Sequence, residues 1–291
     1  MNIAQALQHA RRLLGGDEAA VDARHLLGAC CGLDHAGLIL QEDRTLTPQE
    51  QSRFEDWLER RSRGVPVAYL VGRRGFRNLS LAVNPSTLIP RPDTETLVEA
   101  ALALGAPDRP LRVLDLGTGS GAIALSIAAE RPAWTVVATD RSAEALDVAR
   151  QNAAALGLDR VRFLEGDWFQ ALGIQAPFDL ILSNPPYVAA DDPHLLQGDL
   201  RHEPRSALVS GADGLDDLAR LCAGAPRWLL PGGWLLLEHG WAQGAAVRDL
   251  LCGAGFRSVA TRQDLAGHER VGMGRYDPPA ESAAVTENQQ N

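Results

Sequence analysis

A short proline-containing segment is the part of this sequence best suited to hold a reacting group. It consists of Asn184, Pro185, Pro186 and Tyr187. The side-chain carbonyl of Asn184 and the ring-fixed backbone carbonyl of Pro185 can accept both N–H bonds of a planar amino group. The same oxygens would stabilise positive charge accumulating on that nitrogen, and Tyr187 can cover a flat amide face. The segment therefore favours methyl transfer to a planar, amide-type nitrogen without a general base.

The position of this segment predicts a rigid, exposed loop at the edge of a sheet. It follows residues 178–183, which have the pattern of a strand. Two successive prolines donate no backbone hydrogen bonds, so the strand cannot continue through them. The carboxyl edge of an open α/β sheet is where ligands bind. An isolated tetrapeptide of this kind could still be a structural turn, so the interpretation depends on what else lies at that edge.

A glycine-rich turn is the second segment with ligand-binding chemistry. It consists of Gly117, Thr118, Gly119, Ser120 and Gly121. The turn joins a predicted strand to a predicted helix, so its backbone can pass close to a ligand at the helix N-terminus. Its G-x-G-x-G spacing differs from the G-x-G-x-x-G fingerprint of dinucleotide sites. S-adenosylmethionine, which has no phosphate and carries a cationic sulfonium, suits this turn better.

Acidic and aromatic residues follow the next two predicted strands. Asp140 ends the second strand, where a carboxylate can accept both hydrogen bonds of a ribose diol. Asp167 and Trp168 follow the third strand and add a carboxylate and a flat ring suited to binding adenine. Structural alternatives remain: the glycines could form only a tight corner, Asp140 could cap the helix near Ser142, and Trp168 could be a core residue.

The elements that must position these residues alternate between strands and helices. Predicted strands lie at residues 111–116, 134–139, 161–164, 178–183 and 233–238, and predicted helices at residues 122–130, 142–156, 215–230 and 242–254. This alternation predicts an α/β fold, in which helices cover both faces of a mostly parallel sheet. The first and fourth strands are neighbours in such a sheet, so the glycine turn and the proline loop should face one pocket.

The first part of the chain has a different character. Its apolar residues recur at helical spacing from Ile3 to about Arg63, which predicts a small all-helical bundle. Alternation over residues 76–83 predicts a hairpin after the bundle. The expected division is a helical domain at residues 1–72, a hairpin linker at 73–90, a catalytic domain at 91–276 and a disordered tail at 277–291.

The composition favours a soluble, cytoplasmic protein without a broad surface for nucleic acid. The formal net charge is -9, whereas phosphate backbones are bound by clustered basic side chains. The N-terminus lacks the features of a signal peptide, and no apolar run has membrane-spanning length. His194, His202 and His239 are scattered without the pairing typical of metal ligands, so we expect no metal.

Further segments carry a resemblance to a known family. They are Pro-Val-Ala-Tyr-Leu at residues 66–70, Leu-Ile-Pro-Arg-Pro-Asp-Thr-Glu at 88–95, Glu-Pro at 203–204, Ala-Leu at 207–208, Leu-Glu-His-Gly at 237–240 and Glu-Arg-Val at 269–271. Over residues 1–276 the chain resembles the bacterial peptide chain release factor N5-glutamine methyltransferases, the HemK/PrmC family. That family usually has glutamate where this chain has Asp93, so we leave Asp93 out of the predicted site.

The resemblance implies a class I S-adenosylmethionine-dependent methyltransferase with a Rossmann-like, mostly parallel, seven-stranded sheet. The acceptor would be N5 of the glutamine in the Gly-Gly-Gln motif of class I release factors, held by residues 184–187. Residues 117–121, Asp140, Trp168 and Asn184 would contact the cofactor or the methyl site. The N-terminal helices would dock the release factor, and we expect a monomer that contacts neither nucleic acid nor membrane.

Three alternatives stay open at this point. An enzyme that methylates glutamine in a ribosomal protein would share all of this chemistry, so only substrate assays separate the two. An adenine-N6 methyltransferase would present the same planar amine but would need base flipping, and the acidic balance disfavours it. A non-enzymatic scaffold would predict damage to the glycine turn or the proline loop, and both are intact.

Overall fold

The computed structural model describes residues 1–278, which divide into two units. The helical unit contains Met1–Arg73, Val83–Pro85 and Pro193–His202. The sheet unit contains Arg74–Ala82, Ser86–Asp192 and, within the described part of the chain, residues 203–278. Most of the tail expected to be disordered, at residues 277–291, lies outside the described residues. The separate roles expected for residues 1–72 and 91–276 stay predictions.

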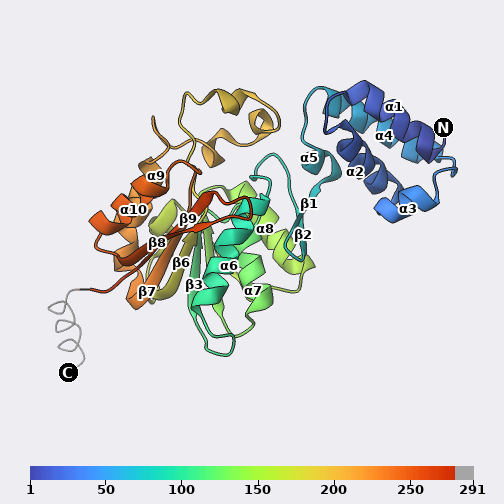
Figure 1. The fold of residues 1–291 in the computed structure, drawn as a ribbon. Coiled ribbons are helices and arrows are strands. Elements are labelled where there is room, and N and C mark those ends of the chain that lie inside the picture. Colours follow the sequence, from blue (N-terminus) through green and yellow to red (C-terminus); the bar gives the residue numbers. More distant parts are fainter. Residues whose placement is uncertain (279–291) are drawn as a thin grey trace. The chain divides into compact units, whose positions relative to one another are not determined.

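The helical unit consists of five helices with well-defined ends (Figure 1). They are α1 (Ile3–Leu14), α2 (Ala19–Cys31), α3 (His35–Leu40), α4 (Pro48–Ser62) and α5 (Val67–Val71). Asn2 and Thr47 cap α1 and α4 through reciprocal capping boxes, which satisfy backbone donors that a helix leaves free. The helical spacing in the sequence extends only to about Arg63, whereas α5 forms beyond it, between Pro66 and Gly72.

A short hairpin of β1 (Arg73–Phe76) and β2 (Leu79–Ala82) follows, as the alternating pattern predicts. Asn152 holds the end of this hairpin. Its Oδ1 accepts from the Ala82 backbone N–H at 2.7 Å, and its Nδ2 donates to the Ala82 carbonyl at 3.0 Å. Nδ2 also donates to the Ser120 carbonyl at 2.9 Å, so one buried amide connects the hairpin to the glycine turn.

The sheet unit is built on seven strands in the order β5-β4-β3-β6-β7-β9-β8. They are β3 (Arg112–Leu116), β4 (Thr135–Asp140), β5 (Arg162–Glu165), β6 (Phe178–Ser183), β7 (Leu229–Glu238), β8 (Arg257–Gln263) and β9 (Glu269–Arg275). Strands β3 to β7 are parallel, and β9 runs antiparallel to both of its neighbours. The predicted fold class, a mostly parallel seven-stranded sheet with an N-terminal helical domain, is confirmed.

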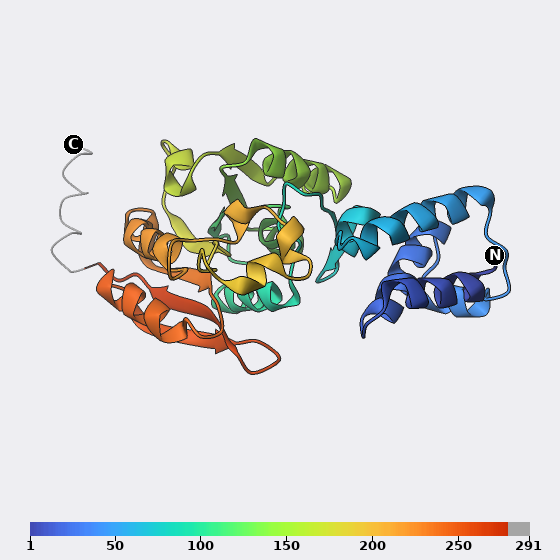
Figure 2. The same cartoon turned by 90° about the horizontal axis from the view of Figure 1, so that it is seen from above.

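Helices cover both faces of this sheet, as Figure 1 and Figure 2 show. One face is covered by α6 (Glu95–Leu104), α7 (Ala122–Glu130) and α8 (Ala143–Ala155), and the other by α9 (Asp216–Gly224) and α10 (Gly244–Gly253). Alternate residues of β3 enter the two cores, Val113 on one side and Leu114 on the other. Among the described residues, no helix has the length and apolar character needed to cross a bilayer.

Two parts of the sheet differ from the sequence pattern. The helix predicted at residues 215–230 ends earlier, because α9 stops at Gly224 and β7 begins at Leu229, which pairs with Phe178. Residue patterning also did not identify β8 and β9 individually. Most residues of β8 are exposed, and Gly272 and Gly274 interrupt the side-chain alternation of β9, so neither strand carries a clear period-2 signal.

Candidate active site

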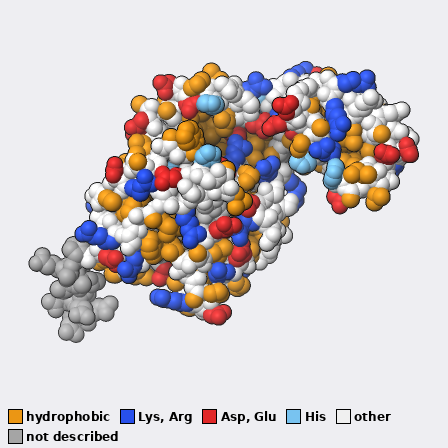
Figure 3. Space-filling model, in the orientation of Figure 1, with side chains coloured by type: hydrophobic (Ala, Val, Ile, Leu, Met, Phe, Trp, Pro, Cys, Tyr) orange, Lys and Arg blue, Asp and Glu red, His pale blue; other side chains and the backbone are white. Residues whose placement is uncertain are grey.

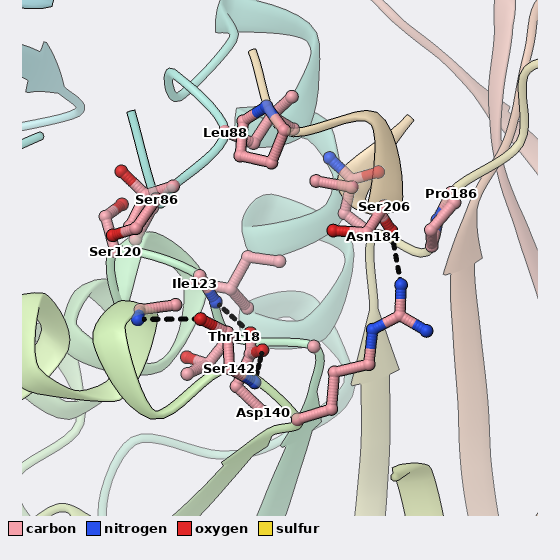
Figure 4. Close-up of a pocket in the computed structure, with 18 of the residues that line it drawn as sticks. Ser86, Leu88, Thr118, Ser120, Ile123, Asp140, Ser142, Asn184, Pro186 and Ser206 are labelled. Atoms are coloured by element: carbon pink, nitrogen blue, oxygen red, sulfur yellow. Dashed lines mark hydrogen bonds between the residues drawn. The ribbon is translucent and has the colours of Figure 1, made fainter. Parts of the chain in front are cut away.

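A cavity of about 980 Å³, including space open to solvent, lies at the carboxyl edge of β3, β4 and β6 (Figure 4). Predicted site residues that line it are Gly117, Thr118, Gly119, Ser120, Asp140, Asp167, Trp168, Asn184 and Pro186. Figure 4 shows Asn184 and Pro186 facing the same space as Thr118 and Asp140. Gly121, Pro185 and Tyr187 were also predicted, and they do not line the cavity.

The glycine turn is held by backbone hydrogen bonds, and its three glycines have positive φ angles. The N–H groups of Gly117 and Thr118 both donate to the Thr139 carbonyl at 2.9 Å. Gly119 has φ of 56°, and a Cβ added there would meet no atom within 4 Å. A Cβ at Gly121, which has φ of 85°, would come within 2.9 Å of Leu125. Gly119 thus leaves room for a ligand, whereas Gly121 permits close packing against α7.

The buried carboxylate of Asp115 stabilises the glycine turn. Asp115 is fully buried, and its Oδ2 accepts from the Thr118 hydroxyl at 2.6 Å and from the Ala124 N–H at 3.2 Å. Burial raises the pKa of Asp115 to about 7, although both hydrogen bonds oppose that shift. Asp115 lies in β3, two residues before the glycine turn, and was not predicted as a site residue. Its structural role is to tie the turn to the first residues of α7.

Asp140 is oriented by two backbone groups. Its Oδ2 accepts from the Gly119 N–H at 2.8 Å, and its Oδ1 accepts from the Ser142 N–H at 2.9 Å. The side chain of Ser142 itself caps α8 by accepting from Ala145, so Asp140 is not the residue that caps this helix. Each carboxylate oxygen retains a second lone pair, which suits a ligand with two adjacent hydroxyl groups.

Asp167 and Trp168 form the side of the cavity nearest α9. Asp167 Oδ2 accepts from Arg220 at 2.7 Å, and Trp168 Nε1 donates to Asp217 at 3.1 Å. A Cβ at Gly117 would lie 3.1 Å from the Trp168 ring, so the ring packs against the glycine turn. Trp168 also packs against the core beneath the sheet. The ring therefore both borders the cavity and contacts the core.

The proline loop places Asn184 at the end of β6, next to β3. Ser183 Oγ donates to the Leu116 carbonyl at 2.7 Å, which fixes the two strand ends together. Asn184 Nδ2 donates to Thr94 Oγ1 at 3.1 Å. The Tyr187 hydroxyl donates to Glu238 Oε1 at 3.1 Å. Tyr187 is thus directed toward β7, although the sequence suggested that it could cover an acceptor amide.

Two segments on the rim of the cavity were missed as site residues. Arg91 lines the cavity and pairs with the buried carboxylate of Glu203, which also accepts from the Ile89 N–H at 3.1 Å. Arg141 donates to the Ser206 carbonyl at 3.0 Å on the same rim (Figure 4). Residues 88–95 and 203–208 contain segments that carry the family resemblance. That resemblance was the feature of the sequence that could have identified them as site residues.

The cavity fits S-adenosylmethionine. Three features match the three parts of that molecule. Gly119 leaves room for the methionine part, the carboxylate of Asp140 is oriented to bind the ribose, and the ring of Trp168 suits the adenine. When bound, the cofactor supplies an electrophilic methyl group. The residues that line the cavity would orient the cofactor.

Comparisons with known proteins agree with this geometry. A family model described as the PrmC N-terminal domain matches residues 5–72, and a methyltransferase domain model matches residues 107–251. The release factor glutamine methyltransferase of Xylella fastidiosa (strain 9a5c) is 57% identical over 255 residues, 88% of this chain and 92% of that protein. The Escherichia coli release factor glutamine methyltransferase is 46% identical over 255 residues, 88% of this chain and 91% of that protein.

A solved methyltransferase from Pyrococcus furiosus has the same fold. It is 18% identical, with a TM-score of 0.54 over 77% of this chain and 100% of that chain. Fold and cavity together define an S-adenosylmethionine-dependent methyltransferase, as predicted. The matches over most of the chain identify the particular group: the chain belongs to the release factor glutamine methyltransferase family.

Proposed function

We propose that this protein transfers the methyl group of S-adenosylmethionine to N5 of the glutamine in the Gly-Gly-Gln motif of class I release factors. The observation that carries the proposal is that Asn184 faces the same cavity as the glycine turn and Asp140. Residues 117–121, Asp140, Asp167 and Trp168 hold the cofactor. Asn184 and Pro185 hold the acceptor glutamine, Pro186 lines the cavity beside them, and Tyr187 anchors the loop to Glu238.

The reaction depends on how the acceptor amide is held. An amide nitrogen is a poor nucleophile because its lone pair is delocalised into the carbonyl group. Asn184 Oδ1 and the Pro185 carbonyl accept its two N–H bonds, which aim the nitrogen into the cavity. The two oxygens also stabilise the positive charge that grows on nitrogen during transfer. The proton then becomes acidic and leaves to water.

The substrate protein would be recognised by more than the catalytic cavity. Ordering a flexible Gly-Gly-Gln loop costs conformational entropy, and contacts by residues 1–72 with the body of the release factor would offset that cost. Figure 3 shows basic and acidic side chains interspersed on the face drawn, which with the net charge of -9 favours a protein substrate over nucleic acid. We expect a cytoplasmic protein, because release factors act in translation.

The test is a methyl-transfer assay with the purified protein, S-adenosylmethionine and a class I release factor. We expect one methyl group on the Gly-Gly-Gln peptide by tandem mass spectrometry, and none on a release factor whose motif glutamine is replaced by glutamate. Ribosomal proteins and nucleic acid are assayed side by side. Methylation of either of these, with no methylation of the release factor, would contradict the proposal.

A further inference from the structure

The side chain of Asn184 has two ends of similar size, and only one of them suits the acceptor. Its carbonyl oxygen accepts hydrogen bonds, whereas its NH2 group only donates. Rotation of this amide by half a turn would present donors to the donor group of a glutamine. Such a rotated Asn184 would repel the substrate, so the reaction needs an interaction that holds Asn184 in one orientation.

Thr94 contacts the NH2 end of Asn184. Asn184 Nδ2 donates to Thr94 Oγ1 at 3.1 Å, and Thr94 is 4% exposed. Thr94 is the last residue of the 3-10 turn η1 (Pro92–Thr94), which precedes α6. A hydroxyl can both donate and accept, so Thr94 distinguishes the NH2 end of Asn184 from the carbonyl end only if its own proton is used elsewhere.

Glu238 provides the acceptor for that proton. It is the last residue of β7 and is 1% exposed. The Tyr187 hydroxyl donates to Glu238 Oε1 at 3.1 Å, and the side chains of Thr94 and Tyr187 both lower the pKa of Glu238, which favours its ionised form. An ionised carboxylate has no donor, so toward Glu238 the Thr94 hydroxyl can donate its proton but cannot accept one. The Thr94 lone pairs then face Asn184 and accept from Nδ2.

We propose that Glu238 and Thr94 are positioning residues that hold Asn184 with Oδ1 toward the acceptor amide. The direction of each hydrogen bond follows from the one before it. The Glu238 carboxylate accepts from the Thr94 hydroxyl, that hydroxyl accepts from the Asn184 NH2 group, and the Asn184 carbonyl is then left to face the cavity. Tyr187 belongs to the same network, because it joins the far end of the proline loop to the same carboxylate. The substrate named here rests on the proposed function, whereas the orientation of Asn184 does not.

The charge on Glu238 gives this arrangement a pH signature. Burial raises the pKa of Glu238 to about 7, and the groups facing it are Tyr187 of the proline loop, Arg270 of β9 and Asp93 of η1. Arg270 lowers that pKa and Asp93 raises it. Below this pKa the carboxyl group gains a proton that it can donate, so the direction of the hydrogen bonds is no longer imposed. We expect kcat to fall as pH drops below about 7.

The test compares Thr94→Val, which keeps the shape but removes the hydroxyl, with Thr94→Ser, which keeps the hydroxyl. Ser126→Ala is the matched control, because Ser126 is a buried residue of α7 whose hydroxyl has no hydrogen-bond partner within the described residues. We expect Thr94→Val to lower kcat by about tenfold to a hundredfold, with the Kd for S-adenosylmethionine within about twofold. Thr94→Ser should restore most of kcat, and Glu238→Gln should lower kcat and remove its fall below pH 7.

A second readout does not require turnover. In ¹⁵N-labelled protein, the side-chain amide protons of Asn184 should exchange with solvent at least about tenfold faster in Thr94→Val than in the unaltered protein. Unchanged exchange, or equal kcat in Thr94→Val and the unaltered protein, would overturn the positioning role. Failure of the unaltered protein to methylate a release factor would instead reject the proposed substrate, and the exchange measurement would still decide the orientation of Asn184.

Discussion

The two halves of the cavity are built in different ways. The glycine turn is held by nearby residues: Thr118 bonds to Asp115 three residues away, and Gly119 bonds to Asp140 21 residues away. The proline loop depends on distant residues, because Asn184 bonds to Thr94 across 90 positions and Tyr187 bonds to Glu238 across 51. The glycine turn is thus encoded locally, whereas the proline loop takes its position only when β6, β7 and η1 have assembled.

Removing the side-chain carbonyl of Asn184 should have the largest effect on kcat. It should also distinguish the acceptor half of the cavity from the cofactor half most clearly. Asn184→Ala deletes the carbonyl that accepts from the substrate amide and stabilises charge on it. We expect kcat to fall by about a hundredfold to a thousandfold, in line with loss of one preorganised polar group. The Kd for S-adenosylmethionine, measured by calorimetry, should change by no more than about threefold. Turnover at the normal rate would show that Asn184 is not the orienting group.

Each half rests on a buried carboxylate, Asp115 beneath the glycine turn and Glu238 beneath the proline loop, and burial raises the pKa of each to about 7. A raised folded-state pKa means that the contribution to stability is largest at acidic pH and is lost as pH rises through about 7. Glu238→Gln should therefore gain up to about 3 kcal/mol in unfolding free energy relative to the unaltered protein between pH 5 and 8.

Chemical denaturation of the unaltered protein, Asp115→Asn and Glu238→Gln across that pH range would measure both contributions. We expect each neutral variant to reduce the pH dependence of the free energy of unfolding. Asp115→Asn should lower cofactor affinity, and Glu238→Gln should lower kcat. A pH dependence that neither variant alters would show that neither carboxylate titrates in this range.

Asp140 tests the cofactor half alone. Asp140→Ala removes the carboxylate that orients Gly119 and faces the cavity. We expect the Kd for S-adenosylmethionine to rise by about tenfold to a hundredfold, because up to two charge-assisted hydrogen bonds are lost. At saturating cofactor, kcat should stay within about fivefold of normal. A loss confined to kcat would place Asp140 in the acceptor half and contradict the division drawn here.

The substitution Trp168→Phe should have the smallest effect on the Kd for S-adenosylmethionine. Trp168→Phe keeps a flat ring against Gly117 but removes the Nε1 bond to Asp217. Because this bond is partly exposed, we expect the Kd for S-adenosylmethionine to rise by only about threefold. Trp168→Ala, which removes the ring, should raise it by about tenfold or more. Equal effects of the two variants would indicate that the ring contributes no stacking.

The same contrast explains how much the sequence alone could predict. The glycine turn, Asp140 and the strand before Asn184 carry local signals, so their place at one sheet edge followed from spacing and strand order. Thr94 and Glu238 carry no such signal, because a threonine before a helix and a glutamate ending a strand are ordinary residues until packing brings them together. Strands β8 and β9 were missed as individual elements because exposure and internal glycines remove their periodicity.

The central claim is that one cavity receives the cofactor on its glycine side and the acceptor amide on its proline side. A crystal structure of the protein with S-adenosylhomocysteine and a Gly-Gly-Gln peptide would test it most directly. The account predicts that the glutamine NH2 group lies within hydrogen-bond distance of Asn184 Oδ1 and points at the cofactor sulfur. A peptide bound away from this cavity, or Asn184 with its Nδ2 toward the glutamine, would contradict it.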